Sequence, residues 1–62
     1  MKIESKSQIR YGVKYRLSDG RICELEEDHP NHEQVVVIAN GQKLVVYTGE
    51  CDDGSLAIVE TA

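Results

Sequence analysis

The chain has 62 residues, 40% of them hydrophobic, and a net charge of −4 at pH 7. This length limits it to one small domain, residues 1–62, near the lower size limit for independent folding, with little room for a substrate cleft. Its apolar content favours a globular chain over a disordered one. No apolar run is long enough to span a bilayer, and the first residues lack the apolar stretch of a secretory signal, so we expect a cytoplasmic protein that does not contact membranes.

Charge is distributed unevenly along the chain. Residues 1–21 carry a net charge of +4, whereas residues 22–62 carry a net charge of −8. A basic front and an acidic remainder either meet inside the fold or face two different partners.

The first predicted element is a strand over residues 9–17, where apolar and polar residues alternate strictly. The segment 17–20, Leu-Ser-Asp-Gly, fits a type I turn that closes a three-residue hairpin. The return strand, residues 21–26, then takes a register that places Tyr15 opposite Cys23, Lys14 opposite Glu24 and, further out, Arg10 opposite Asp28.

A polar connector over residues 26–33 leads to a second predicted hairpin, residues 35–47, which turns at Asn40-Gly41. This hairpin is apolar on both faces. One face holds Val35, Val37, Leu44 and Val46, and the other holds Val36, Ile38, Val45 and Tyr47. Either the loops of a barrel cover the second face or another subunit does, and we favour self-association through the 35–47 hairpin.

The chain ends in a predicted strand over residues 55–60, and residues 1–4 form a short edge strand in this interpretation. No helix, internal repeat or linker is indicated. The predicted fold class is therefore all-β: a small antiparallel meander of four to five strands, forming an SH3-like barrel or a strongly curled sheet.

Basic residues of the first hairpin could track the phosphates of a nucleic acid, with a tyrosine stacking on a base. This set comprises Arg10, Lys14, Arg16, Tyr11 and Tyr15. The predicted register instead pairs the cations with carboxylates of the return strand and turns both tyrosines toward the core. We therefore favour an ion-pair ladder over contact with nucleic acid.

Two cysteines and two histidines, Cys23, His29, His32 and Cys51, have the chemistry of zinc ligands. Their spacing matches no established zinc pattern, so we expect reduced thiols, loop histidines and no metal or other cofactor.

Carboxylates gather in the connector and in the turn before the last strand. The candidate partner-binding residues are Glu26, Glu27, Asp28, Glu50, Asp52 and Asp53. Such an acidic surface suits docking onto a basic patch of another protein. No nucleophile–base motif surrounds any serine, and we expect no enzymatic activity.

The segment 15–21, followed by Asp28, resembles the first strands of Sm-like RNA-binding rings, in which a strand and an Asp-Gly turn precede a loop aspartate. The resemblance covers about a quarter of the chain and implies only a fold-level analogy. The family's glycine in the second strand is absent, and its N-terminal helix has no counterpart.

The sequence thus predicts a small protein-binding module, an accessory or inhibitory protein that occupies the surface of a partner. A phage or mobile-element origin suits that role. The alternative is a small-barrel binder of single-stranded nucleic acid or of a nucleotide.

Overall fold

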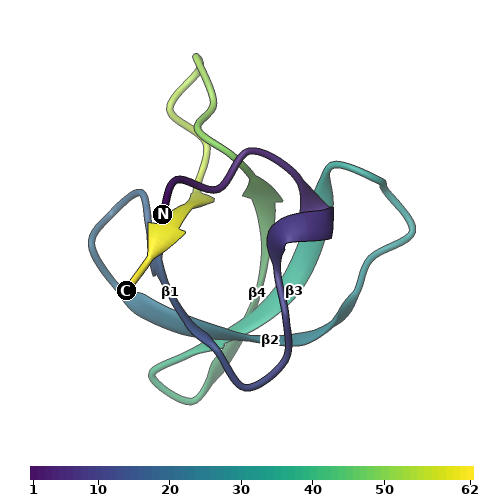
Figure 1. The fold of residues 1–62 in the computed structure, drawn as a ribbon, viewed down its shortest axis with the longest axis vertical. Coiled ribbons are helices and arrows are strands. Elements are labelled where there is room, and N and C mark those ends of the chain that lie inside the picture. The colour runs from purple at the N-terminus through teal and green to yellow at the C-terminus, as the bar shows by residue number, and fades with distance from the viewer.

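The computed structural model describes residues 1–62 and contains five strands in a closed barrel (Figure 1). The strands are β1 (Lys14–Leu17), β2 (Ile22–Asp28), β3 (Gln34–Ala39), β4 (Gln42–Thr48) and β5 (Ala57–Thr61). A single turn of 3₁₀ helix, η1 (Lys6–Gln8), precedes them. The predicted small β-barrel is confirmed, and its form is consistent with an SH3-like barrel. No helix is long and apolar enough to cross a membrane.

The hairpin of β1 and β2 has the predicted register, with Tyr15 opposite Cys23 and Lys14 opposite Glu24. The prediction that β1 begins at residue 9 is wrong, because the strand begins at Lys14. The residues before it form η1 and a turn, so the chain leaves the sheet there. Arg10 consequently lies outside the ladder and is not opposite Asp28.

The hairpin of β3 and β4 turns at Asn40-Gly41, as predicted. Both residues have positive φ angles, 52° and 78°. This is the type I′ geometry, whose twist matches that of the strands and which glycine adopts without a steric penalty. The ladder sets Ala39 opposite Gln42 and Val36 opposite Val45.

The fifth strand closes the barrel between β1 and β4. It runs antiparallel to β1 and parallel to β4, so one of the five strand contacts departs from the predicted antiparallel meander. The number of strands explains this difference: when strands alternate in direction around a closed ring, an odd number leaves one parallel pair. Irregularities between Arg16 and Leu17 and at Glu26 interrupt the ladders, and such bulges bend strands sharply enough for closure.

The two ends of the chain lie side by side at this closure. The amide of Thr61 donates to the carbonyl oxygen of Met1 at 2.9 Å. The predicted edge strand over residues 1–4 is reduced to one bridge between Lys2 and Glu60, with a further bond from the Ile3 amide to the Val59 carbonyl at 2.9 Å.

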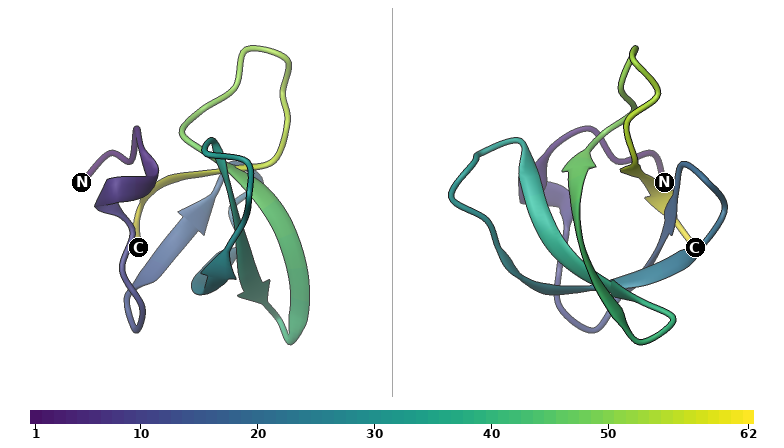
Figure 2. Two further views of the ribbon diagram at one scale, coloured as in Figure 1. Left: turned by 90° about the vertical axis from the view of Figure 1, so that its right-hand side faces the viewer. Right: turned by 180° about the vertical axis from the view of Figure 1, so that it is seen from behind.

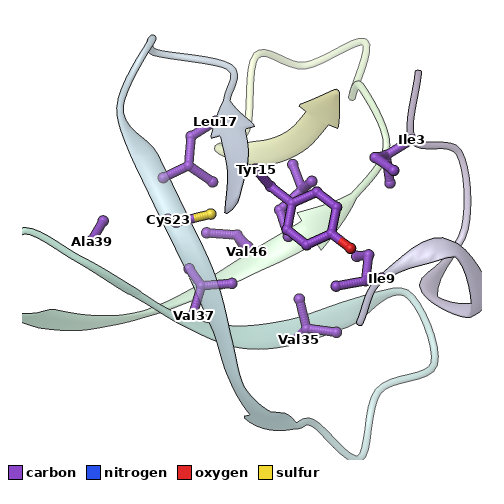
Figure 3. Packing of buried hydrophobic residues seen from close by; sticks show 10 residues of the cluster. Ile3, Ile9, Tyr15, Leu17, Cys23, Val35, Val37, Ala39 and Val46 are labelled. Carbon is purple, nitrogen blue, oxygen red and sulfur yellow. The ribbon is translucent and has the colours of Figure 1, made fainter. Parts of the chain in front are cut away.

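The core fills the barrel and extends under the N-terminal segment (Figure 3). Its ten clustered residues are Ile3, Ile9, Tyr15, Leu17, Cys23, Val35, Val37, Ala39, Val46 and Ile58. Ile3 and Ile9 come from the segment before β1 and cover one end of the barrel. Most inward positions of both hairpins are thus buried, as the alternation predicts, and Leu25 and Leu44 are half-buried against the cluster.

Candidate binding surface

Most cations of the chain have a carboxylate within 4 Å. The pairs at 3.2 Å or less are Lys6–Asp28 (2.7 Å), Lys14–Glu24 (3.2 Å), Arg16–Glu60 (3.1 Å) and Arg21–Asp19 (2.6 Å). Lys43 lies 3.9 Å from Glu26 and 4.0 Å from Glu27. Lys2 and Arg10 are the cations that form no ion pair, so little positive charge is left free on the surface.

The predicted basic stripe does not form as a continuous surface. Arg10 lies off the strand, where its Nη1 donates to the carbonyl of Ser7 at 2.6 Å. Lys14 and Arg16 remain on the outer face of β1, each paired with a carboxylate. The stripe is therefore two neutralised cations and not an open track for phosphates.

The two tyrosines of this set have opposite environments. Tyr15 is 2% exposed, so it has no free face on which a base could stack. Tyr11 is 66% exposed, and the expectation that it faces the core is wrong, because the turn at residues 11–12 directs it outward.

Three of the predicted partner-binding carboxylates lie close to cations. Asp28 pairs with Lys6, and this hydrogen-bonded ammonium holds the pKa of the carboxyl group below its usual range. Glu26 and Glu27 lie within 4.0 Å of Lys43. The connector therefore carries less free negative charge than its sequence indicates.

The carboxylates without a cation gather instead at one end of the barrel. A groove of about 850 Å³, which we term the acidic groove, opens there between the N-terminal segment and the loop from β4 to β5. Among the residues that line it are four carboxylates, which we term the acidic rim: Glu4, Glu33, Glu50 and Asp52. Glu50 and Asp52 were predicted from the sequence. Glu4 and Glu33 were not, because they lie far apart in the chain and meet only through barrel closure.

Backbone contacts hold the walls of this groove together. The carbonyl oxygen of Glu33 accepts hydrogen bonds from the amide of Thr48 at 3.0 Å and from its Oγ1 at 3.3 Å. Gly49 has a φ of 114°, and a Cβ placed on it would lie 3.3 Å from the carbonyl oxygen of Glu4. Glycine at this position thus lets the loop from β4 approach the N-terminal segment closely.

The carboxylates at this end of the barrel affect the pKa of one group, the thiol of Cys51. Partial burial raises the pKa of this thiol, and the charges of Asp53, Glu33 and Asp52 raise it further. The carboxylate of Asp53 also accepts a hydrogen bond from the amide of Ser55 at 2.9 Å, and contacts with Ser55 lower its pKa. The raised pKa makes the Cys51 thiol a poor nucleophile at neutral pH.

The four candidate zinc ligands do not come together. Cys23 is buried in the core, whereas His32 and Cys51 line the groove. The Nδ1 atom of His29 accepts a hydrogen bond from the amide of Asn31 at 3.0 Å within the loop from β2 to β3. No group of three or more His, Cys, Asp or Glu side chains is arranged to hold a metal ion.

The structure thus defines this chain as a small closed five-stranded β-barrel with an acidic groove at one end. Comparisons with protein-family models, with curated proteins and with solved structures find no match to the chain.

Proposed function

We propose that this chain is a small, non-enzymatic protein-binding module that docks its acidic rim onto a basic surface of a partner protein. The single observation that carries this proposal is the segregation of charge. Four carboxylates without a lysine or arginine partner line the groove beside two lysines, Lys2 and Lys6, and Lys6 is bound to Asp28. The four other paired cations of the chain lie outside the groove, next to their own carboxylates. Electrostatic complementarity of this kind speeds association and selects basic partners.

The role proposed for the module is accessory or inhibitory: it occupies a surface that the partner uses for something else. A basic surface that normally binds nucleic acid is a suitable target, because a rim of carboxylates imitates a row of phosphates there. A small chain encoded by a phage or mobile element would fit such a role.

Binding of single-stranded nucleic acid is the alternative, and the surface charge argues against it. Nucleic-acid binders neutralise phosphates with free lysine and arginine side chains. Here only Lys2 and Arg10 lack a carboxylate partner, and Lys2 lies in the wall of the acidic groove.

The proposal is tested by capture from an extract of the source cells with three baits. The first is the wild type, and the second is a rim variant with Glu4→Gln, Glu33→Gln, Glu50→Gln and Asp52→Asn. The third is a matched control, Glu24→Gln, Glu26→Gln, Glu27→Gln and Glu60→Gln, with the same change in net charge outside the rim. We expect the wild type and the control to retain a basic protein that the rim variant loses.

Direct titration of the captured protein gives the quantitative test. The rim variant should raise Kd at least about tenfold, and moderate salt should weaken binding of the wild type, since exposed charges are screened. Equal binding by the rim variant and the wild type would contradict the proposal. Salt-dependent binding of mixed oligonucleotides by the wild type, with no protein captured, would reverse the order of the two candidate functions.

A further inference from the structure

The outer face of β2, β3 and β4 carries an apolar surface that the acidic rim does not include. Val36 and Val45 are opposite each other in the ladder of β3 and β4, and Ile38 follows Val36 on the same face. Ile22 stands two residues before Glu24, the ladder partner of Ile38. We term these four apolar residues the outer stripe.

The outer stripe is partly covered, because the side chain of Lys43 on β4 reaches across β3 to within 3.9 Å of Glu26 and 4.0 Å of Glu27 on β2. Val45 is 49% exposed and Ile22 is 38% exposed, while Val36 and Ile38 are half-buried. The N-terminal segment approaches β4 only at the end of the strand, at Tyr47 and Thr48. The 3₁₀ turn η1 lies away from the rest of β4 (Figure 2, left). A continuous apolar surface on neighbouring strands is typical of a site of protein contact.

Charged residues flank the outer stripe in a fixed order. Along one row of the sheet, Glu24 of β2 is opposite Ile38 of β3, and Ile38 is opposite Lys43 of β4. Glu26 and Glu27 continue the acidic margin along β2. The margin on β2 therefore carries three glutamates, of which Glu24 pairs with Lys14, and the margin on β4 carries one lysine, Lys43.

This order of charges is complementary to the same order on a second copy of the chain. A two-fold axis along β3 lays β2 of one copy over β4 of the other, so that Lys43 of each copy faces Glu24 of the other. In the dimer Lys43 exchanges its ion pairs with Glu26 and Glu27 of its own copy, which at 3.9 and 4.0 Å are longer than a charge-assisted hydrogen bond. Glu24 keeps its contact with Lys14 at 3.2 Å and gains a second cation across the axis. An unrelated partner would need a matching order of charges on its own surface, whereas a second copy of this chain already has that order.

We propose that the outer stripe is the interface of a symmetric homodimer. An interface of standard size takes about 800 Å² from each partner, or about a fifth of the 3898 Å² surface of this chain. The stripe and its margins lie on three of the five strands. The carboxylates of the acidic rim take no part, and either proposal can fail without the other.

Sedimentation velocity over protein concentrations from about 1 μM to about 1 mM tests the dimer, with circular dichroism as a check on folding. The wild type should pass from monomer to dimer, and Val45→Asp should raise the dissociation constant at least about tenfold. Tyr11→Asp is the matched control, because it adds the same charge at an exposed residue away from the stripe. A wild type that stays monomeric throughout, or a dimer that Val45→Asp leaves intact, overturns the proposal.

Charge exchange tests the symmetry separately. Lys43→Glu and Glu24→Lys should each weaken the homodimer, because each creates two contacts between like charges. Mixing the two variants should restore association as a heterodimer, since both contacts across the axis then join opposite charges. If the mixture associates no better than either variant alone, the proposed two-fold arrangement is wrong.

Discussion

Tyr15 is the one aromatic residue of the core, and its hydroxyl group ties the core to the segment before β1. The hydroxyl oxygen accepts a hydrogen bond from the amide of Arg10 at 2.8 Å, and the hydroxyl donates to the carbonyl of Gln8 at 3.4 Å. Figure 3 shows this oxygen beside Ile9, at the edge of the cluster. The side chain thus fills the barrel and also satisfies backbone groups that would otherwise be unpaired.

Replacing Tyr15 with phenylalanine should lower the free energy of unfolding by about 1 kcal/mol, because the amide of Arg10 and the carbonyl of Gln8 lose their partner. Urea denaturation monitored by circular dichroism measures this loss. Tyr11→Phe is the control and should change stability little, since Tyr11 is 66% exposed. Equal losses in the two variants would contradict the role assigned to the Tyr15 hydroxyl.

The Cys23 thiol has the largest pKa shift in the chain, so it should affect the pH dependence of the free energy of unfolding most strongly. Burial, with smaller contributions from Asp19 and Glu24, raises its pKa from 9.0 to about 11. The unfolded chain ionises this thiol above pH 9, whereas the folded chain does so only near pH 11. The contribution of Cys23 to stability is therefore complete below pH 9 and is lost as the pH rises toward 11.

By pH 11 this loss should reach about 2–3 kcal/mol, because each unit of pKa shift corresponds to 1.36 kcal/mol. The measurement compares urea denaturation of the wild type and of Cys23→Ala at several pH values under reducing conditions. Other groups titrate in this range, so the readout is the difference between the two profiles, which should narrow as the pH rises. If the free energies of unfolding of the wild type and of Cys23→Ala change in parallel with pH, the Cys23 thiol has the same pKa in the folded and the unfolded chain.

At the scale of the elements, one side chain holds η1 against the loop that follows β2. The Nζ atom of Lys6 lies 2.7 Å from the carboxylate of Asp28 and donates to the carbonyls of His29 (3.1 Å) and Asn31 (2.9 Å). Because Ile3 and Ile9 flank η1, this contact also keeps the two core residues of the N-terminal segment in place.

Lys6→Gln should return the pKa of Asp28 toward its usual range, which NMR titration of the Asp28 carboxyl group measures directly. In the wild type the pKa of this group is lowered, so its contribution to stability is present above its unfolded pKa and is lost as the pH falls through the folded value. The variant lacks this contribution, and its stability should fall less steeply in acid. Lys14→Gln removes a lysine that pairs with Glu24, and it should leave the titration of Asp28 unchanged.

Local turn chemistry explains which elements the sequence could predict. The turn at residues 17–20 fixes the register of its hairpin from neighbouring residues alone, and the predicted pairs Tyr15–Cys23 and Lys14–Glu24 are confirmed. The second hairpin turns at Asn40-Gly41, as predicted. The alternation over residues 9–13 was misleading, because Ile9 is buried from outside the sheet and Tyr11 is turned outward. The bulge at Glu26 and the parallel contact of β5 depend on closure of the ring, which no short segment encodes.

The candidate site was predictable only in part for the same reason. Glu50 and Asp52 are adjacent to the turn that brings them to the groove, so their local pattern indicated them. Asp28 was expected to be free for a partner, but Lys6 reaches it from 22 residues earlier in the chain. Glu4 and Glu33 join the rim only because the N-terminal segment and the end of the connector meet beside β4.

At the scale of the whole molecule, folding converts a charge asymmetry along the chain into one in space. The basic first third of the sequence finds carboxylates in β2, β5 and its own turn, which neutralises four of its six cations but only three of the nine carboxylates in residues 22–62. What remains is the acidic rim at one end of the barrel and the outer stripe on its side. The structure therefore presents two separate surfaces, one suited to a basic partner and one suited to a second copy.

The hydrogen bond between the Thr61 amide and the Met1 carbonyl at 2.9 Å has a consequence for connectivity. A short glycine-rich linker from Ala62 to Met1 would close the backbone into a ring, and the ring could be cut between Asn40 and Gly41, an exposed turn. This circular permutant should keep the barrel and a cooperative thermal transition, as monitored by circular dichroism. A permutant cut between Val36 and Val37 should not fold, because it divides a strand that pairs on both sides.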